Sequence, residues 1–128
     1  MKLELENKIV NAFPELFYYY FNTESRYPLM FGIETGDGWY YLIQNLCKKI
    51  KNWSNKNEQV RFTQIKEKYG ELRIYSEGYF EEVEIMIDEA SKKSKTICEN
   101  CGSTENVKPT KPWINYLCKD CREKIQKD

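Results

Sequence analysis

The stretch Cys98-Glu99-Asn100-Cys101-Gly102 and the stretch Cys118-Lys119-Asp120-Cys121, with sixteen residues between Cys101 and Cys118, decide how the last quarter of the chain folds. Each C-x-x-C turn lets two sulfurs converge on one metal ion, and two such pairs complete a tetrahedral site. The spacing predicts one structural Zn²⁺ ion bound by Cys98, Cys101, Cys118 and Cys121. Four thiolates leave no coordination position for water, which disfavours catalysis at the metal.

Other chemistries use the same cysteines. Two disulfides would suit a secreted protein, but the charged start Met1-Lys2-Leu3-Glu4 does not resemble a signal peptide, so we expect a reducing, cytoplasmic setting. An iron–sulfur cluster or a rubredoxin-type iron takes the same four ligands and stays an alternative. A redox-active site needs one C-x-x-C on a thioredoxin-like scaffold. The chain has no His, which excludes a mixed Cys/His site.

The residues around the cysteines predict the shape of the metal module. Gly102 suits a tight turn with positive φ, which places the first pair in a loop knuckle. Good helix formers follow Cys121, so the second pair begins a short C-terminal helix. Between the pairs, Pro109 excludes helix and residues 113–117 alternate like a strand. Knuckle, hairpin and helix in this order resemble a treble-clef zinc finger with GATA-like spacing, a scaffold that hosts many functions.

The charge of the chain is balanced overall but unevenly distributed. Lys and Arg total 20, as do Asp and Glu. Residues 1–91 carry 11 basic and 15 acidic side chains, and residues 92–128 carry 9 basic and 5 acidic ones. A modestly basic tail is weak support for a nucleic-acid partner, because dedicated binders are more basic. No apolar run reaches the roughly 20 residues of a membrane span, so we expect no membrane partner.

The remaining sequence predicts an α+β fold. The clearest helix has its apolar residues on one face at helical spacing: Trp39, Leu42, Ile43, Leu46, Ile50 and Trp53. The predicted elements, in chain order, are helices over 1–13 and 14–21, a helix over 39–53, a β-hairpin of 60–69 and 72–76, and a helix over 79–96. We therefore expect a small helical domain with a β-hairpin over 1–95, and a zinc finger over 96–128 docked on it, because the last helix runs directly into Cys98.

The loop before the central helix supplies candidate binding residues. Three glycines in the seven residues 32–38 indicate backbone freedom or a close approach. Asp37 directly precedes the helix, so an N-cap is favoured over ligand recognition. Glu34 has no structural role that the sequence indicates, and Trp39 completes the candidate loop site.

Aromatic and basic residues elsewhere add further candidates. In the run Phe17-Tyr18-Tyr19-Tyr20-Phe21 we expect three side chains in the core and the others on the surface. The alternative is a stacking platform or partner patch that includes Tyr18 and Tyr19. Arg73 belongs to a basic stripe on the hairpin, for which a solvated edge strand is the simpler interpretation. Trp113 is a candidate contact on the finger. Cys47 lies beside the apolar stripe and is predicted to be a buried small hydrophobe.

Three segments in order resemble a group of small, mostly uncharacterised bacteriophage and prophage proteins. They are Gly32-Ile33-Glu34-Thr35-Gly36-Asp37-Gly38-Trp39, then residues 65–75, then the cysteine pairs. The resemblance covers roughly residues 30–122. It implies a phage-encoded accessory protein with zinc at the four cysteines. Some small phage proteins of this kind block host defence by binding a protein or by capturing a signalling nucleotide.

Four functions follow from these observations. The first is a non-enzymatic interaction protein with a protein partner, since aromatic anchors are common in interfaces. The second is nucleic-acid binding through basic residues of the finger: Lys108, Lys111, Lys119, Arg122, Lys124 and Lys127. The third is capture of a nucleotide by Tyr and Arg side chains near the 34–39 loop. The fourth is a metal-independent enzyme using Glu34, Asp37, Glu67 or Tyr, for which no acid–base pairing stands out.

Overall fold

The structure is a computed structural model and describes residues 1–126. Its larger elements combine helices with two small sheets, which is the predicted α+β class. The helices are α1 (Leu3–Ala12), α2 (Tyr18–Phe21), α3 (Tyr40–Lys56), α4 (Glu81–Ser94) and α5 (Lys119–Gln126), with 3₁₀ turns η1 (Thr23–Ser25), η2 (Pro28–Phe31) and η3 (Asp37–Trp39). The strands are β1 (Ile33–Glu34), β2 (Phe62–Lys68), β3 (Glu71–Ser76), β4 (Lys108–Pro109) and β5 (Tyr116–Leu117).

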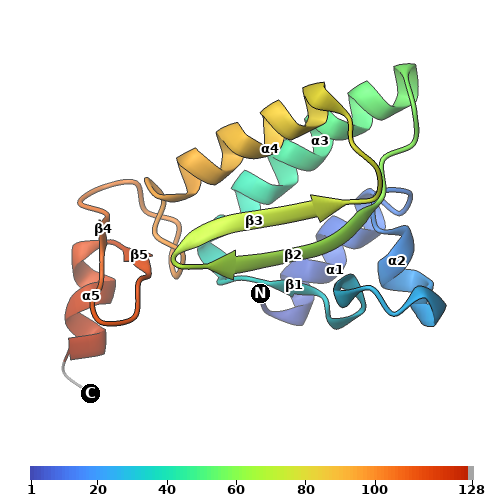
Figure 1. Ribbon diagram of the computed structural model, residues 1–128. Helices are drawn as coiled ribbons and strands as arrows, with labels where there is room; N and C mark the ends of the chain where they lie inside the picture. Colours follow the sequence, from blue (N-terminus) through green and yellow to red (C-terminus); the bar gives the residue numbers. More distant parts are fainter. Residues whose placement is uncertain (127–128) are drawn as a thin grey trace.

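The larger sheet has the strand order β1-β2-β3. Strands β2 and β3 form the predicted antiparallel hairpin, in which Ile65 lies opposite Ile74. Tyr69 and Gly70 connect them with φ values of 53° and 82°, the two positive values that a type I′ hairpin turn requires. Figure 1 shows α3 and α4 side by side along one face of this sheet.

One hydrophobic core joins the helices to the sheet. Apolar side chains at helical spacing on α1, α3 and α4 meet alternate residues of β3 and, on β2, Phe62 and Ile65, between which the strand register shifts. The fully buried members with the largest side chains include Trp39, Phe17, Phe62, Ile9, Ile43, Ile50 and Ile65. Of the aromatic run, only Phe17 is buried, whereas Tyr19 and Tyr20 pack partly against the core and Tyr18 and Phe21 are exposed, so fewer side chains enter the core than the predicted three.

The loop predicted over residues 22–38 contains more structure than the sequence indicates. It holds two 3₁₀ turns and the two-residue strand β1, which pairs in parallel with β2 at Ile33 and Ile65. A strand this short has no periodic pattern of its own, because its place in the sheet is decided by tertiary pairing.

The finger follows α4 and forms a second small sheet. Strands β4 and β5 pair antiparallel, and α5 follows β5 directly. The strand predicted over 113–117 is shorter than expected and covers only Tyr116–Leu117. Its partner β4 is two residues long and includes Pro109, which cannot extend a ladder. Trp113 consequently stands in an exposed loop with 83% of its surface accessible.

Candidate metal centre

The four cysteines of the two C-x-x-C pairs come together in space, as their spacing predicts. Their sulfur atoms all lie within 4.8 Å of one another. The Sγ atoms of Cys101 and Cys118 are 3.7 Å apart. A tetrahedral ion with Zn–S bonds of about 2.3 Å places its sulfurs about 3.8 Å from each other. The donor set therefore fits a single tetrahedral metal ion.

Two different elements present the ligands. In the knuckle, the N–H of Gly102 donates to the Cys98 carbonyl at 2.9 Å, and Gly102 has the predicted positive φ of 86°. Cys118 precedes α5 and Cys121 lies in its first turn, where the helix dipole favours thiolate charge. Together the knuckle, the β4–β5 hairpin and α5 give the order predicted for a treble-clef-like finger.

Hydrogen-bond donors surround the sulfurs. The N–H of Cys101 donates to Cys98 Sγ at 3.4 Å, and the Asn100 amide donates to Cys121 Sγ at 3.3 Å. Donors of this kind stabilise thiolates in a metal site. Cys98, Cys118 and Cys121 are buried with Leu117, whereas Cys101 is exposed. Three of the four ligands are therefore shielded from solvent, and Cys101 is accessible to it.

The alternative of two disulfides does not fit this arrangement. All five cysteines lie in the described residues, and none of them is bonded to another. A disulfide needs sulfurs about 2.05 Å apart, far closer than Cys101 and Cys118. Cys47 is fully buried away from the cluster, which confirms its prediction as a small hydrophobe. Burial raises the pKa of the Cys47 thiol far above its ordinary value.

The glycine-rich loop docks the knuckle onto the rest of the chain. The N–H of Gly38 donates to the Glu99 carbonyl at 2.7 Å, and the N–H of Gly36 donates to Glu99 Oε2 at 2.9 Å. The indole of Trp39 donates to the Ile97 carbonyl at 3.1 Å. The sequence indicates backbone freedom or a close approach at these glycines, and in the structure the backbone of the knuckle approaches them closely.

Trp39 and Asp37 do not have the roles predicted for them. Trp39 has no exposed surface, so it joins the core to the knuckle and is not accessible to a ligand. Asp37 does not cap the central helix, whose N-cap position is Trp39 and has no side-chain cap. The Asp37 carboxylate instead accepts the backbone N–H of Lys2, the N-cap residue of α1, at 2.7 Å. A 3₁₀ turn separates Asp37 from α3 and prevents the predicted cap.

The other candidate carboxylates make separate contacts. Glu34 is exposed on β1, in register with Lys66. Glu67 accepts the N–H of Gly70 at 2.8 Å and so stabilises the hairpin turn. The Asp37 carboxylate binds Lys2 and thus has a partner of its own.

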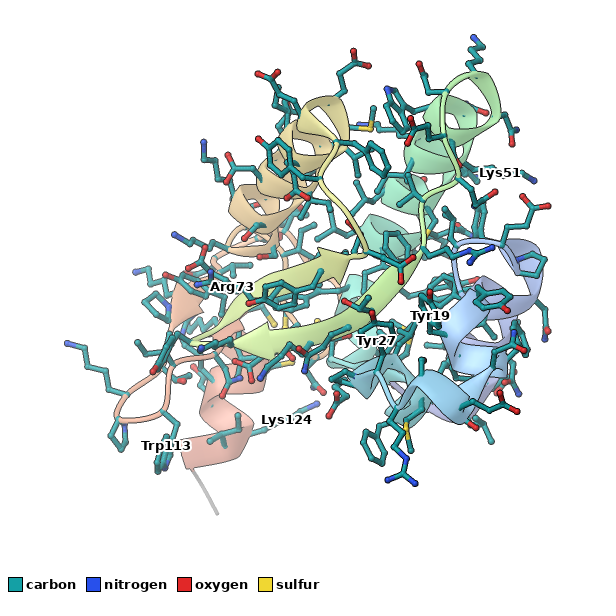
Figure 2. All side chains as sticks on the ribbon, turned by 45° about the vertical axis from the view of Figure 1, so that its right-hand side comes forward. Tyr19, Tyr27, Lys51, Arg73, Trp113 and Lys124 are labelled. Atoms are coloured by element: carbon teal, nitrogen blue, oxygen red, sulfur yellow. The ribbon has the colours of Figure 1, made fainter. Side chains whose placement is uncertain are left out.

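Figure 2 places the remaining candidates on two regions of the surface. Tyr19 and Tyr27 lie together, and the hydroxyl of Tyr19 donates to Glu77 at 2.5 Å. That hydrogen bond raises the pKa of Tyr19. The guanidinium of Arg61 stacks over Tyr18 at 4.1 Å. Arg73 and Trp113 lie at the opposite end of the molecule, near the finger.

A surface groove of about 1000 Å³ is bounded by α1, α3, α4 and the knuckle. Its lysines come from three helices, and Asp37 and Gly38 reach its edge. The polar residues that line it include Lys8, Tyr41, Asn45, Lys49, Lys93 and Thr104.

Sequence reasoning missed two buried carboxylates. Glu6 on α1 accepts the N–H of Ile33 at 2.6 Å and the hydroxyl of Tyr20 at 3.0 Å. Glu99, between two metal ligands, accepts from Gly36 and from Asn115. Burial raises the pKa of Glu99, and these two donors partly offset the shift. Glu6 is enclosed on a helix whose other charges are exposed, and no local pattern distinguishes it from them.

Comparisons with protein-family models, with curated proteins and with solved structures find no match to this chain. Among the described residues, no helix has the length and apolar character needed to cross a membrane. The four-cysteine cluster, supported by hydrogen bonds and docked on the glycine loop, is the site that the structure shows most directly.

Proposed function

We propose that this chain is a non-enzymatic zinc-binding interaction protein whose metal ion has a structural role. The donor set supports this proposal, because four thiolates fill a tetrahedral Zn²⁺ site and leave no open coordination position. The metal would supply much of the folding free energy of the finger, whose own buried cluster contains Leu117 and the cysteines and little else. The knuckle then becomes a rigid extension of the body through Gly38 and Trp39.

The partner in this proposal is another protein, bound at an aromatic patch formed by Tyr18, Phe21, Met30 and Phe31. This patch is the observation that carries the proposal. Helix α2 and turn η2, which supply these residues, contact each other. Phe31 is 73% exposed and Phe21 is 50% exposed. Clustered exposed aromatic and Met side chains are typical of protein interfaces, because burying them against a partner removes apolar surface from water.

The patch rests on an ordered support. Leu29, in the same turn as Met30 and Phe31, is fully buried in the core. Tyr19 and Tyr27 pack edge to face with ring centres 4.7 Å apart. A preorganised surface loses little conformational entropy on binding. Because the chain resembles small phage proteins, the proposed partner is a host or defence protein.

The experiment compares the zinc-loaded protein with the double variant Phe21→Ser/Phe31→Ser. The control, Tyr41→Ser/Tyr79→Ser, removes two exposed aromatic residues from other surfaces. Immobilised proteins are incubated with host lysate, and bound proteins are quantified by mass spectrometry. We expect one discrete partner to be retained by the wild type and the control and lost by the patch variant. Equal retention by all three proteins contradicts the proposal, provided that zinc content and melting temperature are unchanged.

A second candidate function, capture of a nucleotide, is favoured by the groove between the helices and the knuckle. Three lysines line it together with the two carboxylates of Asp37 and Glu89, which leaves one positive charge in excess, and Tyr41 offers an exposed ring. Thermal shift with cyclic and linear nucleotides tests this candidate. We expect stabilisation that Lys49→Ala/Lys93→Ala abolishes and that the aromatic-patch variant retains, and no shift with any nucleotide rejects it.

A further inference from the structure

The face of the larger sheet that points away from α3 and α4 is lined by polar and charged side chains. Along β3, burial alternates, with Leu72 and Ile74 buried and Arg73 and Tyr75 on the other face. Lys66 of β2 lies directly opposite Arg73, and directly opposed residues of antiparallel strands share a face. Lys66 and Arg73 are therefore neighbours on the face that the helices leave uncovered.

Positive charge is in excess on this face. Like charges directly opposite each other destabilise a sheet, which makes the Lys66–Arg73 pair a feature that needs a reason. Two carboxylates offset part of this charge. Glu71 lies 3.4 Å from Arg73 and 3.5 Å from Lys95, and the exposed Glu34 of β1 is in register with Lys66. Among the described residues, the buried Nε of Arg73 has no hydrogen-bond partner. Because this atom is covered, an anion would reach the terminal nitrogens of the guanidinium, whose side chain is 38% exposed.

Exposed aromatic side chains extend from this face to the finger. Tyr75 is 46% exposed on the sheet, and Tyr69 is 70% exposed at the hairpin turn. The ammonium group of Lys68 lies 5.7 Å from the centre of the Tyr69 ring. Trp113 is the most exposed of the large hydrophobic side chains. The charged groups around these rings disfavour a dry protein interface, whereas each exposed ring has a face on which a base can stack.

The hairpin turn and the finger loop are in contact, which makes the surface continuous. A Cβ added to Gly70 would lie 2.9 Å from the Tyr116 ring and 3.0 Å from Ile114. Ile114 is adjacent to Trp113 in the chain, and Figure 2 shows Trp113 and Arg73 at the same end of the molecule. Docking of the finger through Gly38 therefore holds Trp113 beside the hairpin.

We propose that this sheet–finger surface, composed of Lys66, Lys68, Tyr69, Arg73, Tyr75 and Trp113, binds single-stranded nucleic acid. Unpaired bases stack on the aromatic rings, and the cations contact the phosphates between them. A duplex offers phosphates but no free base faces. This ligand is distinct from the proposed protein partner, because Figure 1 shows the finger at the end of the molecule opposite α2, which supplies part of the aromatic patch.

The site differs from the one predicted on the basic residues of the finger. Arg122 donates to the Leu117 carbonyl at 2.6 Å and to the Asn106 carbonyl at 2.7 Å, so its guanidinium stabilises the finger. Lys119 lies 4.0 Å from Glu123 on the same helix. Lys127 of the predicted set is outside the described residues. Lys108 and Lys111 remain available, because both are exposed close to Trp113 in the chain.

The test measures fluorescence anisotropy of labelled oligo(dT) and oligo(U) of about 12 nucleotides with the full zinc-loaded chain. We expect binding at about 50 mM salt that weakens as salt rises, with a log–log slope of about −0.7 for each phosphate contact. Lys66→Ala/Arg73→Ala should make this slope shallower by about 1.4. Trp113→Ala should reduce affinity by roughly tenfold and leave the slope unchanged, because stacking releases no counterions.

The matched controls lie outside both proposed binding sites. Lys48→Ala/Lys56→Ala removes the same number of exposed cations from α3, and Tyr79→Ala removes one exposed ring. Both should bind as the wild type does. A difference between oligo(dT) and oligo(U) assigns the ligand as DNA or RNA. The proposal is overturned by the absence of binding at low salt, by equal losses in the control variants, or by a short duplex that competes as well as the single strand.

Discussion

Gly38 and Glu99 join the helical part of the chain to the metal knuckle by a backbone hydrogen bond of 2.7 Å. No side chain fits between the two segments. A Cβ on Gly38 would overlap the Cys98 carbonyl oxygen and lie 2.6 Å from the Gly102 nitrogen. The glycine-rich loop is thus a surface shaped to receive the knuckle.

Gly38→Ala should release the knuckle from the body. The methyl group meets backbone atoms that cannot move aside without breaking the metal site, so we expect a loss of about 3 kcal/mol in unfolding free energy. Chemical denaturation measures the loss, and limited proteolysis should show new cleavage within residues 96–126. Gly78→Ala is the comparison, because its Cβ makes ordinary contacts and only its φ of 75° opposes substitution. It should cost about 1 kcal/mol and leave the finger protected.

The purified protein should contain one zinc ion per chain. Elemental analysis tests the metal directly, and the absence of visible absorption separates zinc from an iron centre. Chelation removes the ion, and the substitution Cys98→Ser/Cys118→Ser removes half of its ligands. Either change should expose residues 96–126 to protease. Protection that persists without metal would show that packing alone holds the finger in place.

Glu6→Ala should destabilise the body by about 2–3 kcal/mol. The substitution leaves the buried N–H of Ile33 and the hydroxyl of Tyr20 without their acceptor, and hydrogen bonds to a charged group are the costlier ones to lose. Glu4→Ala, on the exposed face of the same helix, should change stability by less than about 0.5 kcal/mol. Similar effects from both variants would mean that Glu6 contributes only helix propensity.

Stability should decline as the pH rises above about 10, in part through Tyr20. Burial, followed by the hydrogen bond to Glu6, raises the pKa of Tyr20 above the ordinary value of 10.0. The folded chain keeps this proton at a pH where the unfolded chain has released it, so the contribution is complete below pH 10 and is lost as the pH rises toward the folded pKa. In Tyr20→Phe, unfolding free energy should depend less steeply on pH in this range. An identical slope would exclude Tyr20 as the source.

Thiol counting should separate Cys47 from the other cysteines. Because burial raises its pKa, Cys47 stays protonated and covered at about pH 8. We expect a thiol reagent to modify four cysteines after mild chelation and the fifth only on unfolding. Cys47→Ala should remove the slow phase alone. Rapid reaction of five thiols after chelation would mean that metal loss unfolds the body as well as the finger.

Much of the fold follows from local patterns. The apolar periodicity of α3 and the alternation around Gly70 identify the central helix and the hairpin, because 3.6-residue and two-residue repeats each match one backbone geometry. The C-x-x-C spacing brings four sulfurs together because a short turn leaves each pair few other arrangements. Pairings between distant segments carry no such signature, and for that reason neither β1 nor the short length of β5 is predictable.

The candidate site likewise combines features that follow from the sequence with features that depend on the tertiary structure. The sequence by itself determined the four ligands, the class of metal they suit and the helices and hairpin beside them, since these depend on residues close together in the chain. Only the tertiary structure decided that Trp39 is buried against Ile97, that Asp37 binds α1 in place of capping α3, and which surface holds the exposed rings. The physical reason is that burial and hydrogen bonding between distant segments depend on how whole elements pack, and that packing is a property of the complete chain.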